Sequence, residues 1–318
     1  MITIRTYQGR DAYEIPKLWN RVLVNDQASR EMIVRKLLLD LNFVPEGFFV
    51  AEEDGKILGF INAVFRHTIF NRGADMENGT GYINCFVVDK EVDVEEVGGL
   101  LIHAAEDYFK KHGKTRIEMG YYPIYFTQGI NEQDHPEYVT LFQKHGYVGN
   151  RSYAMDIDLT AYRTPDNIES KRKNLENEGF YIGPLTDEYL VSFLDIDQPF
   201  TGPSWSFEFR ERLIRELDYD RIRIAAKDGQ VVGACGFGDP NSSMERFGPF
   251  GVNKDLQGKG IGSVLLADAL NEMKKRMLHC AWMQWTSGIG PNSGPSGTVY
   301  RRAGFRETKT YIKFKKKL

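Results

Sequence analysis

A glycine-rich run at residues 257–262, Gln-Gly-Lys-Gly-Ile-Gly, is the part of this sequence best suited to bind an anion. The N-terminus of a helix carries unpaired N–H groups and a partial positive charge, so a turn that opens a helix can hold a phosphate or pyrophosphate. Gly260 and Gly262 have no side chain to keep the backbone away from such a ligand.

The flanking segments predict a strand before this turn and a helix after it. Residues 246–252 are aromatic and apolar, but Gly248, Pro249 and Gly251 interrupt them, which indicates a bulged or edge strand. After the turn, apolar residues recur every four positions and form one helical face: Leu265, Ala269, Met273 and Met277.

Three phosphate-binding motifs compete for this turn. A Walker loop ends in Gly-Lys-Ser or Gly-Lys-Thr, which Gly258-Lys259-Gly260 does not. A dinucleotide fingerprint opens a domain with a regular βαβ unit, whereas these glycines come late in the chain. The third motif is Gln/Arg-x-x-Gly-x-Gly/Ala, which residues 257–262 match. A tight turn without any ligand would explain the glycines alone about as well.

The third motif is the acyl-CoA pyrophosphate loop of the GNAT superfamily of N-acetyltransferases, which this chain resembles. Residues 280–286 predict a strand after the helix. Residues 299–305 then resemble the second GNAT signature, a short helix ending in Leu-Tyr-x-x-x-Gly-Phe, with Gly304 as the expected left-handed cap. Two signatures in the right order make the resemblance specific, and both lie within residues 250–305.

The resemblance implies direct transfer of an acetyl group from acetyl-CoA to a primary amine, without a covalent enzyme intermediate. The strand should pair with the pantetheine amides, and an N–H near its end could polarise the thioester carbonyl. Lys259 could meet a phosphate or remain solvated. The cofactor-binding residues implied are Phe250, Gly251, Val252, Gln257, Gly258, Lys259, Gly260, Ile261, Gly262, Ser263 and, in a loop that departs from the family pattern, Asn292.

Tyr300, in the second signature, is the implied catalytic acid for the departing CoA thiolate; alternatively its ring only packs under the cofactor. Glu245 is a candidate base for the amine, as is Asp239, although both could be solvated turn carboxylates and water could serve instead. The six histidines are scattered without metal-ligand spacing, so no metal is expected.

Bulk composition indicates an ordinary globular protein long enough for two domains: 318 residues, 42% hydrophobic and 27% charged. A net charge of −3 gives no reason to expect nucleic-acid binding. The chain starts with a strand-like segment and has no long apolar span, so we expect a cytoplasmic protein without membrane contact, either monomer or homodimer. The lysines near the C-terminus indicate a solvated last strand. The three cysteines lie in apolar runs and read as buried free thiols.

The chain also repeats itself. A shift of the first half by 164 residues places Gly98 on Gly262 and Val88 on Val252, and a shorter shift places Gly146 on Gly304. We therefore expect an α/β (α+β) fold of two tandem GNAT-type domains, as in mycothiol-synthase-like enzymes, each a mixed, mostly antiparallel sheet flanked by helices. The predicted boundaries are 1–160 for the first domain, 161–179 for a connecting helix and 180–318 for the second domain.

The two copies differ where chemistry is expected. At the turn the first copy has Asp93, Val94, Glu95 and Glu96, whose carboxylates would repel a pyrophosphate. Phe142 takes the place of Tyr300 and lacks its hydroxyl. The first domain is therefore expected to be degenerate and the second to bind acetyl-CoA and carry the activity.

The acceptor is expected to be a small-molecule or peptide amine that the sequence does not identify. Residues 198–205, which contain Phe200 and Trp205, could wall its pocket or fill a hydrophobic seam. Two other functions stay open. One is a non-catalytic acyl-CoA sensor or interaction module. The other is an aminoacyl-tRNA-dependent peptidyltransferase, which the intact CoA loop and the lack of a basic face disfavour.

Overall fold

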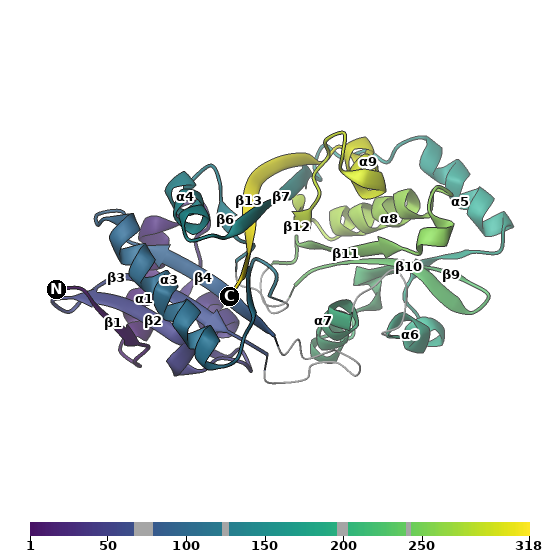
Figure 1. The fold of residues 1–318 in the computed structure, drawn as a ribbon. Coiled ribbons are helices and arrows are strands. Elements are labelled where there is room, and N and C mark those ends of the chain that lie inside the picture. The colour runs from purple at the N-terminus through teal and green to yellow at the C-terminus, as the bar shows by residue number, and fades with distance from the viewer. Residues whose placement is uncertain (67–78, 123–126, 196–202, 240–242) are drawn as a thin grey trace. The chain divides into compact units, whose positions relative to one another are not determined.

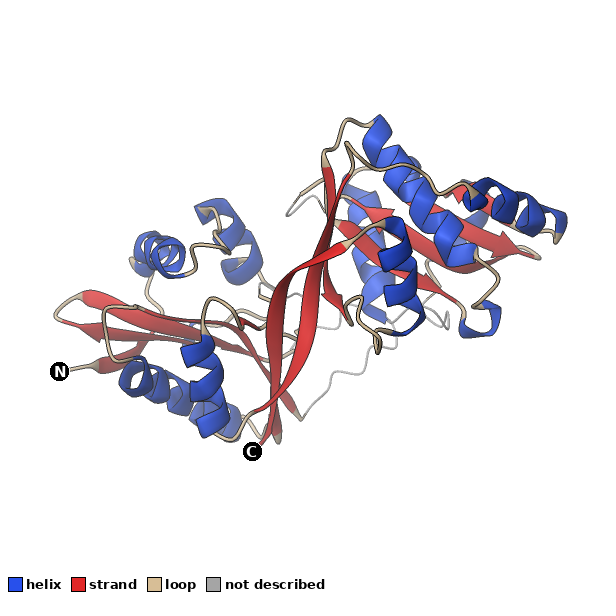
Figure 2. Ribbon diagram, turned by 90° about the horizontal axis from the view of Figure 1, so that it is seen from above, coloured by secondary structure: helices blue, strands red, loops and turns tan. Residues whose placement is uncertain are grey.

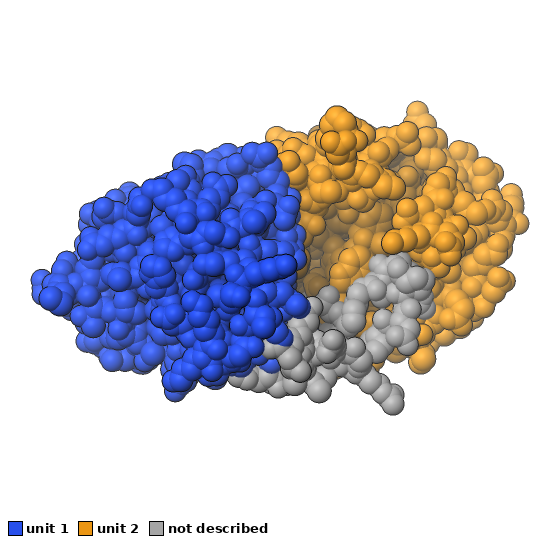
Figure 3. All heavy atoms as spheres, viewed as in Figure 1, with its two compact units in different colours: residues 1–69, 75–152, 309–318 blue, residues 70–74, 153–308 orange. Residues whose placement is uncertain are grey.

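The computed structural model describes residues 1–66, 79–122, 127–195, 203–239 and 243–318. The chain divides into two compact units, shown in different colours in Figure 3. Unit 1 contains residues 1–69, 75–152 and 309–318, and unit 2 contains residues 70–74 and 153–308. In both units, helices flank a sheet (Figure 2).

Unit 1 is built on a sheet in the order β1-β2-β3-β4-β5-β13. Its pairings are antiparallel except for the parallel pair of β4 and β5. The strands are β1 (Thr3–Thr6), β2 (Phe48–Glu53), β3 (Lys56–Val64), β4 (Thr80–Val88), β5 (Arg116–Met119) and β13 (Arg306–Lys317), and the two-residue β6 (Ile130–Asn131) also pairs with β13. The helices are α1 (Asp11–Val22), α2 (Arg30–Ile33), α3 (Val94–Lys111) and α4 (Pro136–Lys144), and a π-helical turn (Val34–Leu38) follows α2.

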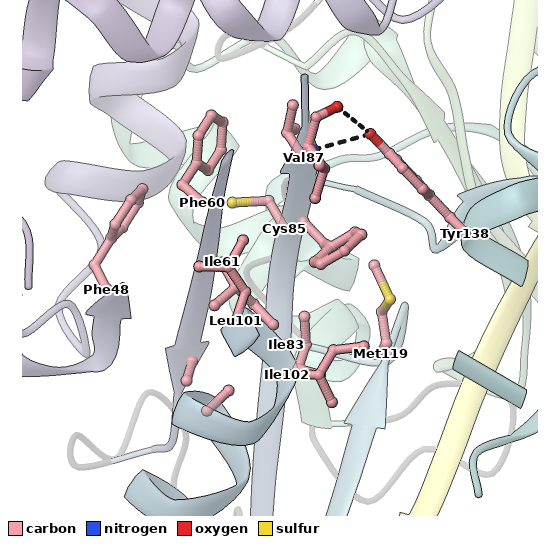
Figure 4. Packing of buried hydrophobic residues seen from close by; sticks show 14 of the residues in the cluster. Phe48, Phe60, Ile61, Ile83, Cys85, Val87, Leu101, Ile102, Met119 and Tyr138 are labelled. Atoms are coloured by element: carbon pink, nitrogen blue, oxygen red, sulfur yellow. Dashed lines mark hydrogen bonds between the residues drawn. The ribbon is translucent and has the colours of Figure 1, made fainter. Parts of the chain in front are cut away.

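The core of unit 1 lies between this sheet and its helices. All nine residues of β4 are buried, as are eight of the nine in β3, because both faces of these central strands are covered. Figure 4 shows Leu101 and Ile102 of α3 packed beside Ile61 and Ile83 of the sheet. The sequence pattern of these strands is a nearly continuous apolar run for the same reason.

Unit 2 is built on a four-stranded antiparallel sheet in the order β11-β10-β9-β8. Its strands are β8 (Tyr181–Pro184), β9 (Ile222–Lys227), β10 (Gln230–Phe237) and β11 (Phe247–Val252). A further strand, β12 (Cys280–Thr286), pairs antiparallel with β7 (Val148–Asp158). The helices are α5 (Asn167–Asn177), α6 (Asp187–Phe193), α7 (Pro203–Arg215), α8 (Ile261–Lys275) and α9 (Gly294–Ala303). Figure 1 shows α8 on one face of the four-stranded sheet and α6 and α7 on the other.

Both units are mixed, mostly antiparallel sheets flanked by helices, as the sequence predicted. The unit boundaries differ from the predicted 1–160, 161–179 and 180–318. The first break comes after Ser152, and α5, predicted as a connector, belongs to unit 2. The last ten residues belong to unit 1.

The C-terminal strand β13 corrects the expectation of a solvated last strand guarded by lysines. Phe314 pairs with Met119 of β5, is fully buried and stacks on Phe142 with ring centroids 5.2 Å apart. Lys315 and Lys316 form ion pairs with Glu118 and Glu106. The strand is therefore an internal member of the sheet of unit 1, although it lies at the far end of the sequence. Of the three cysteines, Cys85 and Cys235 are buried as expected and Cys280 is half-buried.

The predicted strand, turn and helix around residues 246–275 are all present in unit 2. β11 ends at Val252, one 3-10 turn (Lys254–Leu256) follows, and α8 begins at Ile261. Met273 is fully buried on the inner face of α8, as expected. Met277, predicted on the same face, lies beyond the end of the helix and is exposed.

Candidate functional site

The first feature of the candidate site is the start of α8. Gly260 is the N-cap, in the left-handed region at φ 94°, and no side chain caps the helix. The amides of Ser263 and Val264 donate to the carbonyl oxygen of Gly260. Among the residues that the structure describes, the N–H groups of residues 258–262 have no hydrogen-bond acceptor. Five backbone donors at a helix N-terminus are thus available to an anion.

The second feature is a stack of rings beside this turn. A Cβ atom at Gly262 would lie 3.2 Å from the ring of Phe250, so glycine permits close packing of helix on strand. The ring of Phe250 contacts the ring of Tyr300 edge-on, with the ring centroids 5.8 Å apart. The rings of Tyr300 and Phe305 are in a similar contact, with centroids 5.6 Å apart. Burial raises the pKa of the Tyr300 hydroxyl above its ordinary value, so the hydroxyl keeps its proton at neutral pH.

The third feature is the open edge of β11. One edge of this strand pairs with β10, but toward β12 the structure shows only a bridge between Arg246 and Trp282. The two strands therefore part after residue 246. The amide of Asn253 donates to Val232, and backbone groups alternate in direction along a strand, so the N–H groups of Val252 and Phe250 point to the open edge. Residues 248–252 are all half-buried.

Two family models match the chain. The model of the acetyltransferase (GNAT) family matches residues 10–123, and the model of the acetyltransferase (GNAT) domain matches residues 218–307. The chain belongs to the GNAT family. It is an acyltransferase with two GNAT domains in tandem, centred on unit 1 and unit 2.

Solved structures share this tandem fold. A GCN5-related glucosamine N-acetyltransferase region of a fungal multi-domain β-N-acetylglucosaminidase is 19% identical, with a TM-score of 0.80 over 99% of this chain. This chain spans only 38% of that fungal protein. A GCN5-related N-acetyltransferase from Sphaerobacter thermophilus is 17% identical, with a TM-score of 0.71 over 99% of this chain and 95% of the other. A tandem GNAT protein from the clavulanic acid biosynthesis pathway is 14% identical, with a TM-score of 0.64 over 100% of this chain and 98% of the other. No curated protein matches the sequence.

The predicted cofactor residues 257–263 lie at the same turn, but two of their side chains have partners within the protein. The ammonium of Lys259 lies 2.7 Å from a carboxylate oxygen of Glu178. The side-chain amide of Gln257 donates to the carbonyl oxygen of Val252 at 3.3 Å. Ile261 is buried, Ser263 is half-buried, and Asn292 is exposed just before α9. In this state the turn offers backbone N–H groups rather than a lysine to an anion.

Glu245, a predicted base, holds the start of β12. Its carboxylate accepts hydrogen bonds from the amides of His279 and Cys280, at 3.1 and 3.3 Å, and from the Cys280 thiol at 3.2 Å. Partial burial favours the protonated form, but these three donors outweigh it and lower the pKa of Glu245. Asp239, the other predicted base, lies 3.1 Å from the guanidinium of Arg246. Both carboxylates thus have clear structural partners.

In the first GNAT domain, side chains of the protein form hydrogen bonds with the backbone groups at the equivalent positions. Asp93 caps α3 by accepting from the amides of Glu95 and Glu96, at 2.8 and 3.1 Å. The Tyr138 hydroxyl, from α4, accepts from the amide of Val88 at 2.9 Å and donates to its carbonyl oxygen at 2.7 Å, as the dashed lines in Figure 4 show. Comparison of the two sequence repeats found the carboxylates of this domain but missed Tyr138. The shift that places Gly146 on Gly304 also places Tyr138 on Ser296, and this difference was the signal available in the sequence.

Other sequence predictions can be placed only in part. Residues 198–202 of the predicted acceptor loop lie outside the described residues, and Trp205 is half-buried near the start of α7. The described residues contain no cluster of histidine, cysteine or carboxylate side chains that could hold a metal ion. Within the same residues, every helix is too short or too polar to span a bilayer.

Proposed function

We propose that the second GNAT domain transfers an acetyl group from acetyl-CoA to a primary amine. One observation carries the proposal: the unpaired N–H groups of residues 258–262 lie next to the open edge of β11. A helix N-terminus suits a pyrophosphate, and a strand edge suits a chain of amides. Backbone groups that the protein does not pair are satisfied by water or by a ligand, so both sets are available to bind one.

The chain's donors fit acetyl-CoA in two places. The turn before α8 would bind the pyrophosphate through backbone N–H groups, since a left-handed Gly260 turns these groups outward without a Cβ in the way. The outward N–H group of Val252 would pair with the pantetheine arm. Acetyl-CoA supplies a thioester, whose carbonyl carbon the amine attacks.

Two groups of the chain would assist the transfer. The amide of Phe250, at the open edge, would donate to the thioester oxygen as negative charge develops there. The Tyr300 hydroxyl, whose pKa is raised by burial, would give its proton to the departing sulfur. Phe250 and Tyr300 are in ring contact, so both tasks fall within one small region.

The proton of the amine needs an acceptor, and the geometry does not favour Glu245. Three donors already engage its carboxylate, and its pKa is lowered, which makes it a weak base. We assign this proton to solvent, reached through the open side of β11, and the Tyr300 phenolate regains a proton from solvent before the next turnover. The acceptor itself is a small-molecule or peptide amine.

Calorimetry and a CoA-release assay test the proposal. We expect one acetyl-CoA per chain and CoA release that depends on an added amine. Binding without release on a broad amine panel would instead support an acyl-CoA sensor. Absence of acetyl-CoA binding would reject the proposal altogether.

A further inference from the structure

A cluster of charged side chains lies in the second GNAT domain at the closed end of the opening between β11 and β12. Its members are Glu208 and Arg212 of α7, Asp239 after β10, and Arg246 before β11. Arg246 is the residue whose backbone bridges to Trp282 where the strands part. Its guanidinium lies 3.1 Å from both Glu208 and Asp239. This places the cluster beside the proposed reaction region.

Arg212 is the member whose donors are not used. It is 7% exposed, and its Nε and Nη1 groups are buried without a hydrogen-bond partner among the described residues. Only Nη2 is paired, with Glu208 one helical turn earlier. The guanidinium also lies over the Phe209 ring, 5.6 Å from its centroid, which helps to hold it in place. Arginine cannot lose its proton in a protein, so burial leaves a cation with free donors.

The carboxylates of the cluster do not neutralise Arg212 fully. Glu208 is shared between Arg212 and Arg246, and its contact with Arg212 engages Nη2 alone. A buried charge with unsatisfied donors is unfavourable unless an anion completes it. Carboxylate and phosphate groups match the donor geometry of a guanidinium best.

We propose that Arg212 binds an anionic group of the acceptor, so that the acceptor is an amine carrying a carboxylate or phosphate group. This inference rests on the proposed function of the second GNAT domain. Arg246 and Phe250 are four residues apart, or ~13 Å along an extended strand. The amine, which reacts near Phe250, is therefore separated from the anionic group by several bonds.

Matched pairs of amines test this inference: phosphoethanolamine with ethanolamine, glucosamine 6-phosphate with glucosamine, and lysine with 1,5-diaminopentane. We expect the wild-type kcat/KM for the member that carries the anionic group to exceed that of the partner without this group by about tenfold or more, the scale of a charge-assisted hydrogen bond. Arg212→Gln should abolish this preference. The variant leaves Glu208 paired with Arg246, so it creates no isolated buried carboxylate.

Arg210→Gln is the matched control, because Arg210 is an exposed arginine of the same helix. It should retain the preference. The phosphate pairs and the lysine pair show which anionic group is recognised. Since the panel need not contain the natural acceptor, binding of each pair is also measured by calorimetry, with and without CoA.

Equal binding and turnover, by the wild type, of the members with and without the anionic group would overturn the inference, as would a preference that survives Arg212→Gln. If the wild-type protein does not bind acetyl-CoA, the proposed function is rejected instead. The calorimetric comparison without CoA would then still test Arg212 by itself.

Discussion

The two GNAT domains begin equivalent helices in opposite ways. In the alignment that places Gly98 on Gly262, α3 starts one turn earlier than α8, over the residues that form the glycine turn of the second domain. The carboxylate of Asp93 then takes the first free amides of α3. In the second domain the corresponding donors stay free. An internal carboxylate thus occupies in one domain the place that we assign to a pyrophosphate in the other.

The equivalent strands differ in the same sense. Val88 is fully buried and both its backbone groups are bonded to Tyr138, whereas Val252 is half-buried at an open edge. Polar backbone groups must be satisfied by the protein, by water or by a ligand. In the first domain, side chains of the protein satisfy backbone groups whose equivalents stay available in the second. Four experiments test this contrast between the domains, and they follow in decreasing order of expected effect.

The largest effect concerns the strand that completes the first domain. Phe314→Ala removes a fully buried ring that stacks on Phe142, which should lower the free energy of unfolding by about 3–5 kcal/mol. Urea denaturation followed by fluorescence measures the change. Lys317→Ala, at an exposed position of the same strand, should stay within about 0.5 kcal/mol of the wild type. An unchanged midpoint for Phe314→Ala would place this residue outside the core.

Tyr300→Phe tests the proton donor of the second domain. The ring and its packing remain, so acetyl-CoA affinity should be kept while kcat falls by about 10²-fold or more. Because burial raises the pKa of this hydroxyl, its deprotonation should not lower the rate of the parent enzyme between pH 7 and 9. Tyr138→Phe, in the first domain, is the control and should leave kcat unchanged. A Tyr300→Phe enzyme with parental turnover, when the chemical step limits the rate, would assign the tyrosine to packing alone.

Gly260→Glu would bring the carboxylate of the first domain into the second. It adds a like charge beside the free amides and a side chain at a left-handed residue, so acetyl-CoA binding should weaken by about 1–3 kcal/mol. Calorimetry measures the affinity. Gly229→Glu is the matched control, because Gly229 also has a positive φ, in the turn between β9 and β10, with open space around it. Equal affinities for Gly260→Glu and the parent would separate the turn from the binding site.

Asp93→Ala should have the smallest effect. Loss of this N-cap should cost about 1 kcal/mol of stability and leave acetyl-CoA binding as it was. Thermal unfolding and calorimetry on the same sample give both values. A change in acetyl-CoA affinity or stoichiometry would mean that the first domain binds the cofactor after all, and the contrast between the domains would fail.

Predictions from the sequence were most successful where the pattern is local. The glycine turn and the cap of α9 at Gly304 depend on residues close together in the chain, and both are present. The internal repeat was also visible, because Gly98 and Gly262 pack against the equivalent rings of Phe86 and Phe250. The catalytic and cofactor assignments at these residues remain predictions.

The predictions that needed correction concern contacts between distant residues. Glu245 reads as a turn carboxylate in sequence, but the chain brings it to the amides of His279 and Cys280, over thirty positions away. The lysine-rich end reads as a solvated edge, yet β13 pairs with β5 almost two hundred residues earlier. No periodic pattern in the sequence indicates which residues, far apart in the chain, will contact each other.

Local spacing in the sequence was enough to predict the family, the two-domain repeat and the place of the glycine turn, because such spacing controls helices, turns and motifs. Only the tertiary structure decided which backbone groups are free. Tyr138 reaches Val88 across fifty residues and bonds both its N–H group and its carbonyl oxygen, whereas among the described residues only the Gln257 side chain reaches the equivalent Val252, at its carbonyl oxygen. Tertiary packing also buried the Arg212 side chain and left its Nε and Nη1 groups without a hydrogen-bond partner among the described residues. Whether a backbone donor is satisfied depends on neighbours that folding assembles, and in this respect the two domains differ.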